Sequence, residues 1–197
     1  ISVDCGISSY RAVECLNACG IDSLIIDHHE PSHDHLPDAY AIVNPKQKGC
    51  LYPFKNLASV GLVAKLIQAL EGNISEEILD LVALGTIADV VPLRGENRIF
   101  VRLGLPQIEQ TKNKGLAALM EVAKISGKKM SPYHVGFILG PRINATGRLD
   151  SAHKSLDLFL SEDKIAAAAL AKQLDGFNTQ RQKIQKEMIE EALEIVE

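Results

Sequence analysis

The sequence predicts an α/β fold: a parallel β-sheet flanked by helices, followed by a helical region and a long connecting helix. Two observations support this fold class. Short apolar runs that end abruptly at polar or charged residues indicate buried strands, and they lie at 1–5, 22–27 and 39–43. Helical periodicity dominates the rest of the chain and continues without a break from residue 162 to residue 197.

The first two apolar runs form a unit with the segment between them. Residues 8–19 have helical spacing, and Gly20 fits the position where that helix would stop. Strand, helix and strand within about 30 residues is a βαβ unit, whose strands are parallel and joined by a right-handed crossover. We therefore expect the carboxyl ends of both strands at one edge of the sheet, where open parallel sheets bind ligands.

Helices are expected to follow the third strand. Asn56 is a good N-cap for the first of them. Glu76 and Glu77, in the first turn of the second, interact favourably with its helix dipole. The predicted helices are 56–71, 75–88, 98–110, 115–125, 132–139, 151–160 and 163–197. The last one is alanine-rich and then charged with both signs, which is typical of a solvent-bridging connector.

Composition limits the class of protein. At 197 residues, with a hydrophobic fraction of 46%, the chain can bury one sizeable domain plus an appendage. No apolar run is long enough to span a bilayer, so no membrane partner is expected. The cysteines lack Cys-x-x-Cys spacing and stand in apolar or helical settings, at Cys5, Cys15, Cys19 and Cys50. A reduced, cytoplasmic compartment therefore fits better than a disulfide framework.

The second apolar run ends in Asp27-His28-His29, three groups that can bind a metal or move a proton. Neutral imidazole and carboxylate together suit divalent metals such as Mn²⁺ or Zn²⁺. Asp4, at the end of the first run, should lie beside this tripeptide at the same sheet edge. A solvated loop is the alternative interpretation, because four of the six histidines lie between residues 28 and 35.

Asp89 is a third acidic candidate. It follows the mostly apolar helix predicted at 75–88. An isolated buried carboxylate is too costly, so this one must be paired, hydrogen-bonded or bound to a metal. The alternative is that Asp89 caps the helix, since Pro92 ends it shortly afterwards.

The charges are unevenly distributed. The formal net charge of −4 argues against a uniformly basic nucleic-acid binder. Residues 110–154, however, hold eight Lys or Arg against two acidic residues, which is typical of a surface that contacts a phosphate backbone. A solvated lysine face is the simpler interpretation for Lys112, Lys114, Lys128 and Lys129.

Arg142 and Arg148 are the expected phosphate-binding residues, with Asn144 as an assistant. The glycines and the proline of 140–147 indicate a turn at this position. Glycine permits close approach of the backbone to a ligand, and the planar fork of arginine matches phosphate oxygens.

Three of these segments, in this order, resemble the second, third and fourth motifs of the DHH phosphoesterase superfamily. They are Val3-Asp4-Cys5-Gly6, Asp27-His28-His29 and Gly85-Thr86-Ile87-Ala88-Asp89-Val90-Val91-Pro92-Leu93. Further segments are similar to the bacterial exonucleases of that superfamily that are specific for single-stranded DNA. These segments are 36–46, 55–61, 140–150 and 178–182. The resemblance therefore covers essentially the whole chain.

The resemblance implies a metal-dependent exodeoxyribonuclease that degrades single-stranded DNA from 5′ to 3′ in DNA repair and recombination. The implied partners are single-stranded DNA and, by family resemblance, a single-stranded DNA-binding protein and a RecQ-type helicase. The implied cofactor is a pair of Mn²⁺ or Mg²⁺ ions about 3.5–4 Å apart, which generates hydroxide and clamps the two reacting oxygens.

The resemblance also suggests a role for each residue. We expect Asp4, His28 and Asp89 to bind metal, with the two carboxylates able to bridge ions. Asp27 would orient the histidines, as carboxylates near metal ligands commonly do. His29 would contact the scissile phosphate or protonate the leaving oxygen. The division of roles between His28 and His29 stays open at this point.

Family resemblance further implies that part of the site lies outside residues 1–197. The first motif of the superfamily, an Asp-x-Asp loop, is expected before Ile1, and a second domain with a glycine- and histidine-rich motif is expected after Glu197. We therefore predict an internal segment, with 1–160 as the C-terminal part of the catalytic domain and 161–197 as the helix leading to the second domain. Alone, this segment should be inactive or nearly so.

Two other functions fit the same pattern. A DHH-family oligoribonuclease, or a hydrolase of small phosphoesters or pyrophosphate, would share the metal residues, but 140–150 and the long last helix favour the exonuclease. A catalytically inactive binding subunit of a replication complex is the second alternative. Such subunits tend to lose metal ligands, whereas every ligand expected in this window is present.

Overall fold

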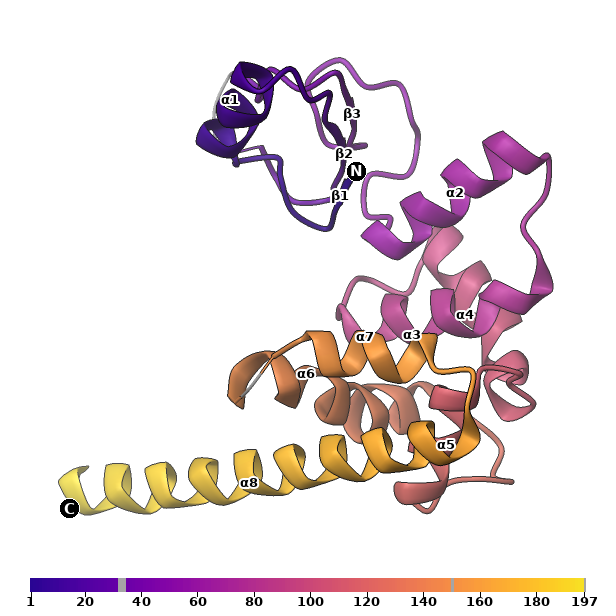
Figure 1. Cartoon of the computed structure of the whole chain (residues 1–197), viewed down its shortest axis with the longest axis vertical. Coiled ribbons are helices and arrows are strands. Elements are labelled where there is room, and N and C mark those ends of the chain that lie inside the picture. The colour runs from indigo at the N-terminus through magenta and orange to yellow at the C-terminus, as the bar shows by residue number, and fades with distance from the viewer. Residues whose placement is uncertain (32–34, 150, 197) are drawn as a thin grey trace. The chain divides into compact units, whose positions relative to one another are not determined.

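The computed structural model describes residues 1–31, 35–149 and 151–196. The chain forms two compact units, 1–104 and 105–197, and Figure 1 shows the elements of each. The domain boundary near residue 160 that the sequence suggests stays a prediction. Among the described residues, no helix combines the length and the apolar character needed to cross a membrane.

The first unit begins with a three-stranded parallel sheet in the order β1–β2–β3. Its strands are β1 (Ser2–Val3), β2 (Leu24–Ile26) and β3 (Ala41–Val43). Ser2 pairs with Ile25 in one ladder, and Ile25 pairs with Ile42 in the other. Helix α1 (Tyr10–Ala18) connects β1 to β2 beside the sheet (Figure 1). The predicted α/β class and its parallel sheet are confirmed, although each strand is shorter than the run that predicted it.

Helices build the rest of the first unit. They are α2 (Ser59–Glu71), the 3₁₀ turn η1 (Glu76–Ile78), α3 (Leu79–Ala88) and the start of α4 (Gly95–Glu109). They bury one apolar cluster with β2, formed by Ile26, Leu57, Leu62, Ala64, Leu79, Val82 and Phe100. A Cβ on Gly85 would lie 3.0 Å from Val60 Cγ1, so α3 and α2 pack closely there and a larger residue would displace the Val60 side chain.

The second unit is helical. It contains α5 (Lys114–Val122), the π-helical turn η2 (His134–Leu139), α6 (Gly140–Leu149), α7 (His153–Leu160) and α8 (Lys164–Val196). The first half of α8 packs on α5, α6 and α7 and buries Ala167, Ala171 and Leu174. From 182 to 195 every side chain of α8 is exposed. The predicted helical region and long last helix are confirmed.

The turn predicted at 140–147 is wrong, because these residues belong to helix α6. It continues directly from η2, and neither Gly140 nor Gly147 adopts a left-handed backbone. A proline inside an α-helix clashes with the carbonyl four residues earlier and lacks an N–H donor. The wider π turn before Pro141 accommodates this ring. Packing of α6 on α7 and α8 then outweighs the low helix propensity of glycine.

Candidate metal centre at the edge of the sheet

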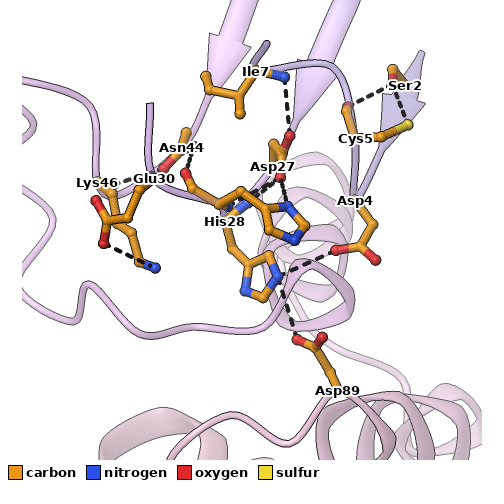
Figure 2. A network of polar contacts seen from close by, with 11 residues as sticks. Ser2, Asp4, Cys5, Ile7, Asp27, His28, Glu30, Asn44, Lys46 and Asp89 are labelled. Atoms are coloured by element: carbon orange, nitrogen blue, oxygen red, sulfur yellow. Dashed lines mark hydrogen bonds and ion pairs between the residues drawn. The ribbon is translucent and has the colours of Figure 1, made fainter. Parts of the chain in front are cut away.

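The polar residues that follow the three strands meet at the carboxyl edge of the sheet. Asp4 follows β1, residues 27–29 follow β2, and Asn44 follows β3. Asp89 is the C-cap residue of α3; its amide closes the last turn, while its side chain points to His28. Figure 2 shows the carboxylates of Asp4 and Asp89 directed at the ring of His28.

Asp27 is fully buried and connects the loop after β1 to the residues that follow β2. Its Oδ2 accepts a hydrogen bond from the Ile7 amide at 3.0 Å, and its Oδ1 accepts from the amides of His28 (2.8 Å) and His29 (3.1 Å). Burial raises the pKa of Asp27, but these bonds and one from the His29 ring lower it by more, to below its usual 3.8.

The same carboxylate orients the ring of His29. Nδ1 of His29 lies 2.7 Å from Asp27 Oδ1. An ionised carboxylate can only accept hydrogen bonds, so Nδ1 is the donor. The other ring nitrogen, Nε2, is left for partners outside this pair, and the side chain of His29 is 57% exposed.

The imidazole of His28 lies between two carboxylates. Its Nε2 is 3.4 Å from Asp4 Oδ1 and 3.4 Å from Asp89 Oδ2. This nitrogen is buried, and within the described part of the chain it has no hydrogen-bond partner. Buried polar atoms in folded proteins nearly always have a partner. A cation bound by the nitrogen and the two carboxylates would satisfy it.

The electrostatics of the centre also favour a cation. Burial raises the pKa of Asp89 above its usual 3.8, His28 lowers it in part, and the Asp4 carboxylate raises it again. A divalent ion would remove this repulsion between carboxylates. One ligand atom each from Asp4, His28 and His29 also lie within 4.8 Å of one another. Imidazole nitrogen with carboxylate oxygen fits Mn²⁺ or Zn²⁺, and the carboxylates also suit Mg²⁺.

The backbone is strained on both sides of the centre. Asp4 has a φ of 63°, and Val90, directly after Asp89, has a φ of 60°. The left-handed region is unusual for any residue with a side chain, and for a β-branched one it is an outlier that costs roughly 1–3 kcal/mol. Strain of this kind clusters at active sites and ligand clamps, which supports a functional role for the two aspartates.

A cavity of about 230 Å³ lies beside Asp4 and Asp89. The end of β1, the start of α2 and the end of α3 form its wall, through Val3, Asp4, Ala58, Ser59, Val60, Val63, Gly85 and Asp89. A water molecule takes about 30 Å³ in the liquid, so there is room for a hydrated ion next to the carboxylates.

Two buried asparagines that support the centre were not predicted from the sequence. Asn44 Nδ2 donates to the His29 carbonyl (2.9 Å), and its Oδ1 accepts from the Lys46 amide (2.8 Å). Asn97 Oδ1 accepts from the Ala58 amide (3.2 Å), just before α2. The Asn-Pro dipeptide after β3 marks a strand end, but no sequence pattern shows that its amide side chain is buried.

Comparison with known proteins identifies the first part of the chain. The model of the DHH family, N-terminal domain, matches residues 1–86, which include Asp4 and the Asp27-His28-His29 tripeptide. The chain contains a DHH-family domain. The resemblance drawn from the sequence motifs is thereby confirmed.

Curated relatives extend the similarity beyond the DHH domain to the whole chain. The chain is 45% identical to the single-stranded-DNA-specific exonuclease RecJ of Bacillus subtilis (strain 168), over 100% of this chain and 25% of that protein. It is 42% identical to the RecJ of Escherichia coli (strain K12), over 100% of this chain and 37% of that protein. The chain thus spans between a quarter and somewhat over a third of these relatives.

Solved structures share the fold. A crystal structure of exonuclease RecJ bound to manganese superposes with a TM-score of 0.82 at 34% identity, covering 96% of this chain and 48% of that one. RecJ from Thermus thermophilus in complex with Mg²⁺ gives a TM-score of 0.67 at 32% identity, covering 96% of this chain and 27% of that one. The DHH domain and the helical unit therefore both occur in structures that hold divalent metals.

The predicted site residues fall into two groups. In the first unit, the structure brings together Asp4, Asp27, His28, His29 and Asp89. In the second unit, α6 contains Arg142, Asn144 and Arg148. Arg142 Nε donates to Asp175 Oδ1 (2.9 Å) and its Nη1 to the Ile138 carbonyl (2.7 Å). Asn144 is exposed, and the side chain of Arg148 lies outside the described part.

Proposed function

We propose that this chain provides the metal centre of an exonuclease that degrades single-stranded DNA from the 5′ end in DNA repair and recombination. The main observation is the buried Nε2 of His28, which lies between oxygens of Asp4 and Asp89 and lacks a hydrogen-bond partner among the described residues. The activity in the names of the RecJ relatives supports the substrate. Their Mn²⁺ and Mg²⁺ complexes support the metal.

Asp4, His28 and Asp89 are the proposed ligands for Mn²⁺ or Mg²⁺. A pair of divalent ions would neutralise the charge of the phosphodiester and make water a stronger nucleophile. The fold holds the ligands in place: the Asp4 amide donates to the Ile26 carbonyl at 2.9 Å, and the Asp89 amide donates to the Gly85 carbonyl at 3.0 Å. These bonds hold the main chain from which both carboxylates reach His28.

Asp27 and His29 have different proposed roles. Asp27 accepts hydrogen bonds from both histidine amides and from the His29 ring, so it positions the tripeptide without contacting substrate. His29 donates through Nδ1 and presents Nε2 at a partly exposed edge. From there Nε2 would contact the scissile phosphate or transfer a proton to the leaving oxygen.

Arg142, Asn144 and Arg148 are the proposed phosphate-binding residues. Asp175 and the Ile138 carbonyl hold the Arg142 guanidinium in one orientation. A guanidinium has five N–H donors, and these two bonds use two of them. A held guanidinium loses less entropy when it binds a phosphate, which favours this role.

The test uses the full-length natural protein with Mn²⁺ and single strands labelled at either end. We expect nucleotides to be released from the 5′ end of single strands and a duplex with blunt ends to resist. Asp89→Asn should lower the rate more than about 100-fold, beyond the cost of losing an outer-shell partner. Asp22→Asn makes the same chemical change at an exposed position and should leave the rate unchanged.

Other outcomes of this experiment favour the alternatives. Faster hydrolysis of dinucleotides or pyrophosphate than of long strands would identify a small-substrate hydrolase. Failure to bind Mn²⁺ or to cleave any of these substrates would identify a binding subunit.

We also propose, from the family resemblance alone, that a single-stranded DNA-binding protein and a RecQ-type helicase act with the enzyme in the cytoplasm. Cys5, Cys15, Cys19 and Cys50 are all free thiols, which supports a reducing compartment. Co-purification of the tagged natural protein with either partner, tested after nuclease treatment, would check the proposed associations.

A further inference from the structure

Two aromatic side chains of the second unit stack on each other at the surface. Tyr133 is 62% exposed and Phe137 is 73% exposed. Their ring centroids are 5.2 Å apart and the rings are inclined by 25°, which is a stacked arrangement. Large apolar rings are normally covered, so an exposed and mutually stacked pair points to a ligand with flat faces.

The local helix geometry explains the stacking. Tyr133 is the N-cap residue of η2, and Phe137 lies within this π-helical turn. A π turn is wider than an α turn, so residues four positions apart lie more nearly above one another. Such turns are frequent at functional sites. On the opposite side of the same turn Val135 and Leu139 are fully buried, and they anchor it in the core.

Neighbouring contacts hold the backbone that leads into this surface. The Ser131 amide donates to His134 Nδ1 at 3.2 Å, and the Ser131 hydroxyl lies 2.8 Å from the same nitrogen. The Met130 amide donates to Glu109 Oε1 at 2.7 Å, and the Met130 side chain is buried. A rigid aromatic surface needs little ordering when it binds a ligand.

The charge of the sequence segment that contains the pair indicates the class of ligand. From 122 to 149 the sequence contains no Asp or Glu but five basic residues: Lys124, Lys128, Lys129, Arg142 and Arg148. Lys128 and Lys129 are exposed and directly precede the anchored Met130. A ligand that combines flat aromatic faces with regularly spaced negative charge is a single-stranded nucleic acid.

We propose that Tyr133 and Phe137 form a stacking platform for bases of single-stranded DNA, with Lys128 and Lys129 contacting the adjoining phosphates. This inference rests on the proposed function for its ligand and adds a binding site outside the metal centre. Every base has a π face, so such a platform accepts any sequence, as a general exonuclease requires.

Binding to an oligothymidine and to an abasic strand of equal length separates stacking from charge. The full-length natural protein is titrated with each labelled strand in EDTA, where cleavage cannot interfere. Phe137→Ala should weaken oligothymidine binding about 5- to 150-fold, the cost of losing one stacked base, and leave abasic binding unchanged. Phe137→Trp should restore it. Leu160→Ala removes an exposed apolar side chain from the same unit and should change neither affinity.

The lysines should behave in the opposite way. Lys128→Ala and Lys129→Ala should weaken binding of both strands alike, and each should reduce the slope of log affinity against log salt by about 1.

Several results would overturn the platform. Equal losses on both strands for Phe137→Ala, or no loss on either, would exclude base stacking. A lower melting temperature without a thymidine-specific loss would assign the aromatic pair to protein packing. Failure of the proposed function looks different: the protein would bind oligothymidine through Phe137 but would not cleave it when Mn²⁺ is added.

Discussion

The two compact units differ in their backbone strain and in how they place polar and charged groups. In the first unit the candidate metal centre combines two left-handed backbone positions, a buried nitrogen without a described hydrogen-bond partner, and a carboxyl whose pKa is raised. In the second unit, α5 and the helices around it bury Leu119, Leu158 and Leu174 completely, and the charge of Arg142 is paired. The first region therefore gives up stability to hold polar groups close together, whereas the second is a closely packed set of helices.

The largest expected effect is the loss of metal binding when the His28 ring is removed. His28→Gln should lower Mn²⁺ affinity more than the roughly 10- to 100-fold that follows the loss of an outer-shell partner. The free energy of unfolding without metal should change little, because the Nε2 of His28 makes no hydrogen bond within the described residues. Calorimetric titration with Mn²⁺ and urea unfolding measure the two quantities.

His29→Gln is the matched variant. It should lower turnover while leaving most of the Mn²⁺ affinity, if His29 contacts the phosphate. A larger loss of affinity for His29→Gln than for His28→Gln would exchange the roles of the two histidines.

The next effect concerns the residue that positions both histidines. Asp27→Asn should reduce Mn²⁺ affinity by about 10- to 100-fold, because it weakens the anchor of the tripeptide without removing a ligand. The lowered pKa of Asp27 means that its ionised form stabilises the fold above pH 3.8, and this contribution is lost as the pH falls further. Urea unfolding across acidic pH should therefore show a weaker pH dependence in the variant. An unchanged dependence would contradict this role.

A substitution in the second unit should lower the free energy of unfolding and leave Mn²⁺ affinity unchanged. A Cβ on Gly115 would lie 2.0 Å from the Leu158 carbonyl oxygen, so α5 and α7 would have to separate. We expect Gly115→Ala to lower the free energy of unfolding by about 1–3 kcal/mol, while Mn²⁺ affinity stays unchanged.

Gly176→Ala provides the control in another helix of the same unit. No atom of the described residues beyond its own helix backbone lies within 4 Å of a Cβ at Gly176, in α8, so alanine should stabilise the helix by roughly 0.5–1 kcal/mol. Equal destabilisation by the two variants would show that close packing at Gly115 is not the cause.

The smallest effect concerns a polar contact of the first unit outside the metal centre. The Tyr52 hydroxyl donates to Glu96 Oε2. Burial, followed by this bond and the charge of Glu96, raises the pKa of Tyr52 to about 12. The unfolded chain ionises near pH 10, so stability from Tyr52 is complete below that pH and is lost as the pH rises towards 12. Tyr52→Phe should flatten this decline in urea unfolding, whereas Tyr40→Phe, at an exposed tyrosine, should not.

The sheet and the residues at its edge could be predicted because they depend on local pattern. Apolar runs ending at Asp4 and Asp27 indicate strand ends, and parallel pairing brings such ends to one edge. The direction of the Asp89 side chain was harder to predict, because a capping residue and a metal ligand look alike in sequence. In the structure Asp89 caps the helix through its amide and faces His28 through its carboxylate.

The main error followed from local rules that tertiary packing overrides. Glycine and proline at 140–147 normally interrupt helices, yet α6 is helical because η2 relieves the proline and because α7 and α8 cover its side. The supporting roles of the buried Asn44 and Asn97 were not predicted, for a related reason. Asn44 bonds the His29 carbonyl and Asn97 bonds the Ala58 amide, and no local sequence pattern reveals these distant partners.

The parallel order of β1, β2 and β3 has a consequence for how the chain acquires its fold. Parallel strands cannot pair through a tight hairpin, so each pairing must close a long loop. Contacts between residues distant in sequence form slowly, whereas single helices such as those of the second unit form in microseconds or less. We expect the helices to appear first and the edge that joins Asp4, His28 and Asp89 to assemble last. The chain would then gain the ability to bind an ion only when folding is complete.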